Sequence, residues 1–138
     1  MTLVDSNVLL DLVAADPQWA DWSIASLEAA RLRGPLFITD VVYAELGVRN
    51  QRIELLDEFV AKAGLELVGL PRPALFLAGK AFAEYRMKGG TRTGVLPDFL
   101  IGAHAAMTKL PLLTRNERRY RTYFPTIELI LPVSAGPG

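Results

Sequence analysis

The chain has 138 residues, of which 51% are hydrophobic and 22% are charged, and its formal net charge at pH 7 is zero. This length and composition predict one globular domain and exclude a disordered chain. The chain has no cysteine, which excludes a disulfide framework, a thiolate zinc site and a cysteine nucleophile, and its single histidine, His104, argues against a histidine-rich metal site. A metal site would therefore need oxygen ligands, which favours Mg²⁺ or Mn²⁺.

The first part of the chain predicts a strand followed by two helices. Thr2–Asp5 is a short apolar strand that ends in a carboxylate, and Ser6 or Asn7 can cap the short helix Val8–Val13. A longer helix, from Asp16 to about residue 33, begins with a capping aspartate and a first-turn proline. A glycine and a proline then end it.

The rest of the chain alternates between strands and helices. The predicted strands are Leu36–Ile38, Leu65–Val68, Leu112–Thr114 and Ile127–Leu131. The predicted helices are one capped by Thr39 or Asp40, then Ile53–Ala63, one that ends near Lys88, Pro97–Met107 and Asn116–Tyr120. Gly89–Gly94, with the sequence GGTRTG, is predicted to be the most flexible stretch. This alternation predicts an α/β fold with a central, mostly parallel sheet of four to five strands and helices on both faces.

Charge is unevenly distributed along the chain. Residues 1–70 carry 11 acidic and 5 basic side chains, whereas residues 71–138 carry 4 acidic and 10 basic ones. This asymmetry suggests one pole that repels phosphate and one that attracts it. The apolar runs are too short to span a bilayer and the first residues do not resemble a signal peptide, so we expect a cytoplasmic protein.

Four oxygen-bearing side chains are predicted to meet at one end of the sheet. Asp5 follows the first strand and Asn116 follows the fourth. Glu45 lies on the helix after the second strand, and Asp98 is in the first turn of its helix. In parallel sheets the ligand site lies at the carboxyl ends of the strands. Because clustered carboxylates repel one another and a divalent cation is the usual compensation, this pattern predicts a metal site.

Simpler structural interpretations exist for some of these residues. Asp98 could merely complement the N-terminus of its helix, and Glu45 could be an exposed helix residue. Apolar neighbours favour partial burial of Glu45, where an unpaired carboxylate is costly. Four other aspartates are assigned to helix caps and solvated faces: Asp11, Asp16, Asp21 and Asp40.

Four stretches of the chain resemble PIN domains, and specifically VapC-type toxins of toxin–antitoxin systems. They are LVDSNVLLDLV around Asp5, ITDVVYAEL around Glu45, LPDFLIGAHA around Asp98 and LLTRNERRYRTYFP around Asn116. The resemblance lies in the order, context and spacing of all four. It implies a single PIN domain over residues 1–138 with a three-layer α/β/α fold, cleavage of RNA with Mg²⁺ or Mn²⁺, an antitoxin protein as partner, and a homodimer.

Carried over residue by residue, the resemblance assigns roles to several positions. Asp5, Glu45 and Asp98 match the three core acidic positions of the family. Ser6 and Thr114 match hydroxyl positions that support the metal ion or its waters. On this basis Asp5 and Asp98 would hold the metal ion, and Glu45 would complete the site or accept a proton from the attacking water.

The chain departs from the family at the fourth catalytic position. Many relatives have Asp where this chain has Asn116, and others have Asn there with an Asp three residues later, where this chain has Arg119. An amide offers a neutral oxygen and no charge, so one or two metal ions remain possible. Four nearby arginines could bind flanking phosphates or form a solvated or antitoxin-binding face: Arg115, Arg118, Arg119 and Arg121.

Two other functions compete with the ribonuclease hypothesis. A haloacid-dehalogenase-like phosphatase also begins with Asp after the first strand, but its motif needs a second Asp where this chain has Asn7. A PIN fold that has lost catalysis and serves as an RNA- or protein-binding module is the stronger rival, because of Asn116. The three carboxylates argue against this rival, because their mutual repulsion would be left uncompensated if no metal ion bound them.

Overall fold

A parallel sheet of five strands lies at the centre of the computed structural model, which describes residues 1–92 and 94–132. In chain order the strands are β1 (Thr2–Val4), β2 (Leu36–Thr39), β3 (Leu65–Val68), β4 (Leu112–Leu113) and β5 (Leu129–Ile130). Their order across the sheet is β3-β2-β1-β4-β5, and every neighbouring pair is parallel. The predicted α/β class and parallel sheet are therefore confirmed.

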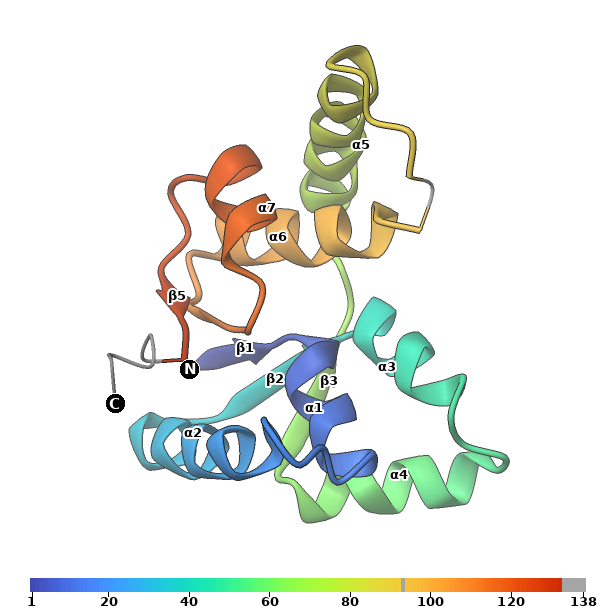
Figure 1. Cartoon of the computed structure of the whole chain (residues 1–138), viewed down its shortest axis with the longest axis vertical. Coiled ribbons are helices and arrows are strands. Elements are labelled where there is room, and N and C mark those ends of the chain that lie inside the picture. The colour runs from blue at the N-terminus through green and yellow to red at the C-terminus, as the bar shows by residue number, and fades with distance from the viewer. Residues whose placement is uncertain (93, 133–138) are drawn as a thin grey trace.

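Helices cover both faces of this sheet. They are α1 (Ser6–Val13), α2 (Ala20–Arg33), α3 (Asp40–Gly47), α4 (Ile53–Lys62), α5 (Arg72–Met87), α6 (Leu96–Thr108) and α7 (Glu117–Tyr123). Figure 1 shows α1, α2 and α4 on one side of the sheet and α6 and α7 on the other, which gives three layers. Helix α5 packs against α6 and projects away from the sheet. None of the described helices is long and apolar enough to cross a membrane.

The observed helices begin at slightly different residues from the predicted ones. Helix α1 starts at Ser6 because Asp5 itself caps it. Asp16 accepts hydrogen bonds from two following amides, as a capping residue does, but a turn separates it from α2. Thr39 caps α3 through its hydroxyl. The predicted flexible stretch at residues 89–94 includes Thr93, which lies outside the described residues.

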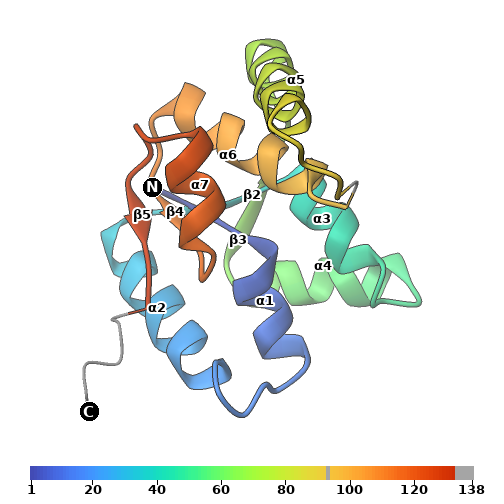
Figure 2. The same ribbon diagram turned by 45° about the horizontal axis from the view of Figure 1, so that its top comes forward.

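The order of the strands reverses at β1, and this distinguishes the carboxyl end of β1 from the other strand ends. The chain moves outward from β1 to β3 and then returns to β4 on the other side of β1. The crevice at such a reversal, outside the carboxyl ends of the strands, is the usual ligand site of open parallel sheets. Strand β1 is buried along its whole length, and Asp5 at its end is only 1% exposed. Figure 2 shows α1 leaving this end of β1, with α7 and α3 on either side.

Candidate active site

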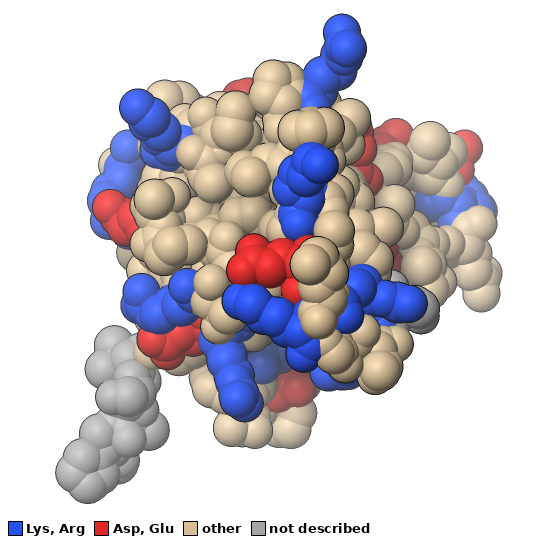
Figure 3. All heavy atoms as spheres, turned by 90° about the horizontal axis from the view of Figure 1, so that it is seen from above, with Lys and Arg blue, Asp and Glu red and all other residues tan. Residues whose placement is uncertain are grey.

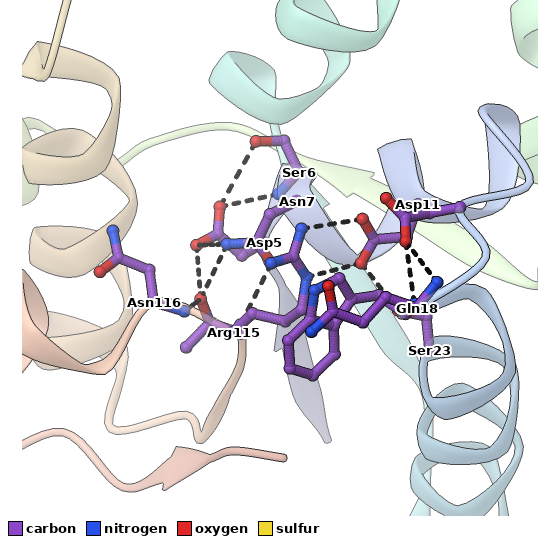
Figure 4. Close-up of polar contacts among 11 residues, drawn as sticks. Asp5, Ser6, Asn7, Asp11, Gln18, Ser23, Arg115 and Asn116 are labelled. Atoms are coloured by element: carbon purple, nitrogen blue, oxygen red, sulfur yellow. Dashed lines mark hydrogen bonds and ion pairs between the residues drawn. The ribbon is translucent and has the colours of Figure 1, made fainter.

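Asp5 is the centre of a hydrogen-bond network at the carboxyl end of β1 (Figure 4). Its Oδ2 accepts from the hydroxyls of Thr114 and Tyr120, each at 2.8 Å, and from Nδ2 of Asn7 at 3.3 Å. Its Oδ1 accepts from the amide of Ser6 at 2.7 Å and from the Ser6 hydroxyl at 3.4 Å. These donors fix the orientation of a carboxylate that solvent barely reaches.

Three carboxylates form one electrostatic cluster around this network. Burial raises the pKa of Asp5, and the charge of Asp98 raises it further, although the hydroxyl donors oppose the shift. Burial also raises the pKa of Glu45, and the charges of Asp5 and Asp98 add to this effect, whereas the Ser6 hydroxyl opposes it. The structure therefore brings together the three acidic residues that the order of strands and helices had singled out.

Glu45 carries an unsatisfied oxygen into this cluster. Helix α3 follows β2 directly, so Glu45, near the end of that short helix, stays on the side of the sheet where β1 ends. Its Oε1 is buried and accepts no hydrogen bond. An unpaired buried carboxylate oxygen is costly, and a cation beside it would remove the cost. This orphaned atom and an all-oxygen donor set fit a divalent cation such as Mg²⁺ or Mn²⁺.

Asp98 is held by an arginine of α7. Its Oδ2 accepts from Nη1 of Arg119, and the two side chains are 25% and 19% exposed. Burial raises the pKa of Asp98, whereas Arg119 and the more distant charge of Arg92 lower it. Within residues 1–92 and 94–132, no three Asp, Glu or His side chains are arranged to hold a metal ion as they stand. A cation would thus have to draw Asp98 away from Arg119.

Asn116 does not join the carboxylates. Its backbone amide donates to the Thr114 hydroxyl at 3.0 Å, but its side chain caps nothing. Figure 4 shows this side chain pointing away from Asp5. It lines a hollow beside α7 instead. The expected convergence of four oxygen-bearing side chains therefore reduces to three, because the backbone turn before α7 directs Asn116 outward.

Arg115, expected as a phosphate-binding candidate, has a structural contact. Its guanidinium donates to both carboxylate oxygens of Asp11, at 2.7 and 2.8 Å, and lies 4.8 Å from the ring centre of Trp19. Asp11 is 5% exposed and also accepts from Ser23, so its assignment to a cap or a solvated face was wrong. This contact ties the loop after β4 to α1 and α2, and it engages the Arg115 guanidinium in an ion pair within the fold.

The other three arginines differ in their availability. Arg119 pairs with Asp98, and Arg121 pairs with Glu117 on an exposed face of α7. No described carboxylate lies within ion-pair distance of Arg118, which is exposed. Of the four, Arg118 is thus best placed to contact a phosphate.

Two contributors to the site had no clear signal in the sequence. The Tyr120 hydroxyl reaches Asp5, and burial together with the nearby carboxylate charges raises the pKa of Tyr120 far above 10.0, so it remains a donor. Asn7 donates to Asp5 and Thr114 and accepts from the amide of Arg115.

The raised pKa of Glu45 predicts a pH-dependent effect of Glu45→Gln. An ionised Glu45 destabilises the metal-free fold above its raised pKa, and the penalty fades as the pH falls through that pKa towards the ordinary value of 4.5. In EDTA, Glu45→Gln should therefore raise Tm by a few degrees at about pH 7.5 and have little effect near about pH 4. Thermal unfolding at both pH values measures this. The exposed Glu54→Gln is the matched control, and an equal rise in that variant would contradict the cluster.

Comparisons with known proteins show the family to which most of the chain belongs. The PIN domain family model matches residues 2–125. A structure of VapBC2 from Rickettsia felis bound to promoter DNA is 21% identical, with a TM-score of 0.71 over 94% of this chain and 97% of that chain. A toxin–antitoxin complex from Klebsiella pneumoniae is 21% identical, with a TM-score of 0.66 over 94% and 96%. FitAcB from Neisseria gonorrhoeae is 20% identical, with a TM-score of 0.65 over 94% and 96%. No curated protein matched the chain.

Proposed function

Since the chain belongs to the PIN-domain family, we propose that it is a metal-dependent endoribonuclease and the toxin of a toxin–antitoxin pair. The observation that carries the proposal is the buried carboxylate cluster at the carboxyl end of β1, with an unpartnered oxygen on Glu45. A fold kept only for protein or RNA binding gains nothing from three mutually repelling carboxylates. The cluster is therefore best explained by the binding of Mg²⁺ or Mn²⁺.

Each residue of the site has a separate task in this proposal. Asp5, Glu45 and Asp98 hold the cation, which when bound supplies Lewis-acid activation of water and of the phosphate. Thr114 and Tyr120 keep the Asp5 carboxylate in one orientation through their hydrogen bonds. Glu45 completes the cation site or accepts the proton of the attacking water, because its carboxylate lies in the same cluster.

Cleavage of RNA that depends on an added divalent cation is the direct test. Purified protein is incubated with mixed tRNA, rRNA and mRNA in Mg²⁺, Mn²⁺ or EDTA, and the ends of the fragments are mapped. We expect discrete cuts with either cation and none in EDTA. Binding of RNA without cutting under all three conditions would favour the non-catalytic alternative, a PIN fold that serves as an RNA- or protein-binding module.

The toxin role rests on the structural neighbours. Several of them are toxin–antitoxin assemblies with the same fold over most of this chain. We accordingly propose an antitoxin protein as partner, a homodimeric toxin and action on RNA in the cytoplasm. Expression of the chain alone should arrest growth, and co-expression with the product of a neighbouring small gene should restore it. Growth arrest by an Asp5→Asn variant as strong as that of the native chain would refute toxicity through cleavage.

A further inference from the structure

A hollow of about 550 Å³ lies between α5 and α7, outside the carboxylate cluster. It is lined by residues of α5, α7 and the segments that precede α6 and α7: Tyr85, Arg92, Asn116, Arg118, Arg119, Thr122 and Tyr123. The volume lies in the range of small-molecule sites. Its lining combines three arginines, two tyrosines and an amide, and contains no carboxylate. Such a lining suits a negatively charged ligand with a flat ring.

The arginines of this hollow are available to a ligand. Arg92 and Arg118 are exposed, and no described carboxylate lies within ion-pair distance of either. The backbone amide of Arg92 donates to the Tyr85 hydroxyl at 3.2 Å, which links Arg92 to α5. Two uncompensated guanidinium groups on one hollow favour binding of phosphate.

The tyrosines form a supported aromatic wall. The rings of Tyr85 and Tyr123 lie 6.2 Å apart, and each also contacts Phe99, at 5.6 and 5.1 Å between ring centres. Both tyrosines are partly exposed, whereas Phe99 is fully buried behind them. Rings held in this way can stack on a nucleobase with little loss of side-chain freedom.

The hollow adjoins the carboxylate cluster through two of its arginines. Arg119 lines the hollow and pairs with Asp98. The charge of Arg92 lowers the pKa of the same carboxylate. Figure 3 shows one face of the surface, on which basic side chains lie around a few acidic ones. A ligand in the hollow would therefore continue into the cluster.

We propose that this hollow binds a nucleotide adjacent to the scissile phosphate of single-stranded RNA. Arg92 and Arg118 hold a phosphate of that nucleotide, and Tyr85 and Tyr123 contact its base. Single-stranded RNA is favoured because a base inside a duplex remains stacked and cannot reach an aromatic wall. The position next to the scissile phosphate rests on the proposed ribonuclease function, whereas binding itself does not.

Fluorescence anisotropy with a labelled single-stranded RNA and its duplex, measured on the full chain in EDTA, tests the proposal. We expect Arg92→Gln/Arg118→Gln to weaken binding of the single strand about tenfold at moderate salt, and to reduce the slope of log K against log salt by about 0.7, the value for one lost phosphate contact. Arg33→Gln/Arg49→Gln removes the same charge from exposed positions elsewhere and should change binding less than about twofold. Native protein should bind the duplex more weakly than the single strand.

Equal losses in the two double variants, or duplex binding as tight as single-strand binding, would overturn the proposal. Tyr123→Leu should also weaken binding without changing the salt slope, because the ring carries no charge. Its Tm is recorded alongside, and the arginine variants decide the matter if this variant unfolds. If the protein cleaves RNA with Mn²⁺ but both double variants lose the same binding, the RNA-binding role of the hollow is refuted and the proposed ribonuclease function is not. If only Arg92→Gln/Arg118→Gln weakens binding and no condition gives cleavage, the hollow binds RNA and the proposed ribonuclease function is refuted.

Discussion

Asp5→Asn is expected to abolish metal-dependent cleavage, with a loss of roughly 100-fold or more. The substitution removes the negative charge of the most buried carboxylate of the cluster and keeps its size. With that charge missing, the cation loses a principal ligand, and Glu45 and Asp98 cannot replace it from their own positions. The rate of RNA cleavage at saturating Mn²⁺ is the measurement. Cleavage by Asp5→Asn at the native rate would refute the assignment of Asp5 to the metal site.

The same variant should keep its fold. An amide in place of the Asp5 carboxylate can keep its oxygen where Thr114 and Tyr120 donate to Oδ2, and it then loses only the hydrogen bonds from Ser6. Loss of the Asp5 charge also relieves its repulsion of Asp98. We therefore expect the metal-free variant to melt no lower than the native protein, and the rise in Tm on adding Mn²⁺ to disappear. Asp21→Asn, on the exposed face of α2, should change neither quantity.

The sequence was sufficient to predict the parts of the site that depend on topology. A carboxylate at the end of β1 and a hydroxyl at the end of β4 must meet if those strands are adjacent and parallel, and Thr114 does donate to Asp5. Glu45 could also be placed, because its apolar neighbours predicted that this face of the helix is partly buried. The placement of Asp5 and Glu45 needed only the period of the hydrophobic pattern and the order of the elements, whereas Thr114 was assigned from the resemblance to PIN domains.

The choice of ion-pair partners could not be predicted in this way. Arg115 and Asp11 are 104 positions apart in the chain, and Arg119 and Asp98 are 21 apart. Four arginines occur within seven residues, and three of them lie on α7, where a small rotation of the helix would change which carboxylates they reach. The outward direction of Asn116 likewise depends on the backbone angles of a single turn. Long side chains and turn angles are decided by tertiary packing, which a pattern of residue types does not specify.

The Arg119–Asp98 ion pair leads to a prediction with opposite signs in the presence and absence of metal. Arg119 lowers the pKa of Asp98, which burial raises. Arg119→Gln therefore leaves an ionised, largely buried Asp98 without its partner. In EDTA at about pH 7.5 we expect a loss of about 1–2 kcal/mol in the free energy of unfolding, less than for a fully buried pair because both side chains keep some contact with water. The corresponding fall in Tm is roughly 3–7 °C.

The pH dependence of this loss follows from the same carboxylate. Without Arg119 the pKa of Asp98 rises further, so the folded state holds its proton more tightly than the unfolded state does. The destabilisation is then complete above the raised pKa of Asp98 and disappears as the pH falls through it towards 3.8. Unfolding in EDTA across this range should show the two proteins converging at low pH. A constant difference at all pH values would mean that Arg119 acts through packing and not through its charge.

With Mn²⁺ present, Arg119→Gln should have the opposite effect and favour the metal-bound protein. In the native chain the cation must displace the guanidinium from Asp98, whereas in Arg119→Gln that carboxylate is already free. Mn²⁺ should therefore bind Arg119→Gln more tightly, and the rise in Tm on adding Mn²⁺ should be larger than for the native protein. Arg119→Lys keeps the charge and should lie between them, and Arg121→Gln, which breaks an exposed pair on the same helix, should behave as native. If calorimetric titration gave the same Mn²⁺ affinity for Arg119→Gln and the native chain, Asp98 would lie outside the reach of the cation, and the site would rest on Asp5 and Glu45 alone.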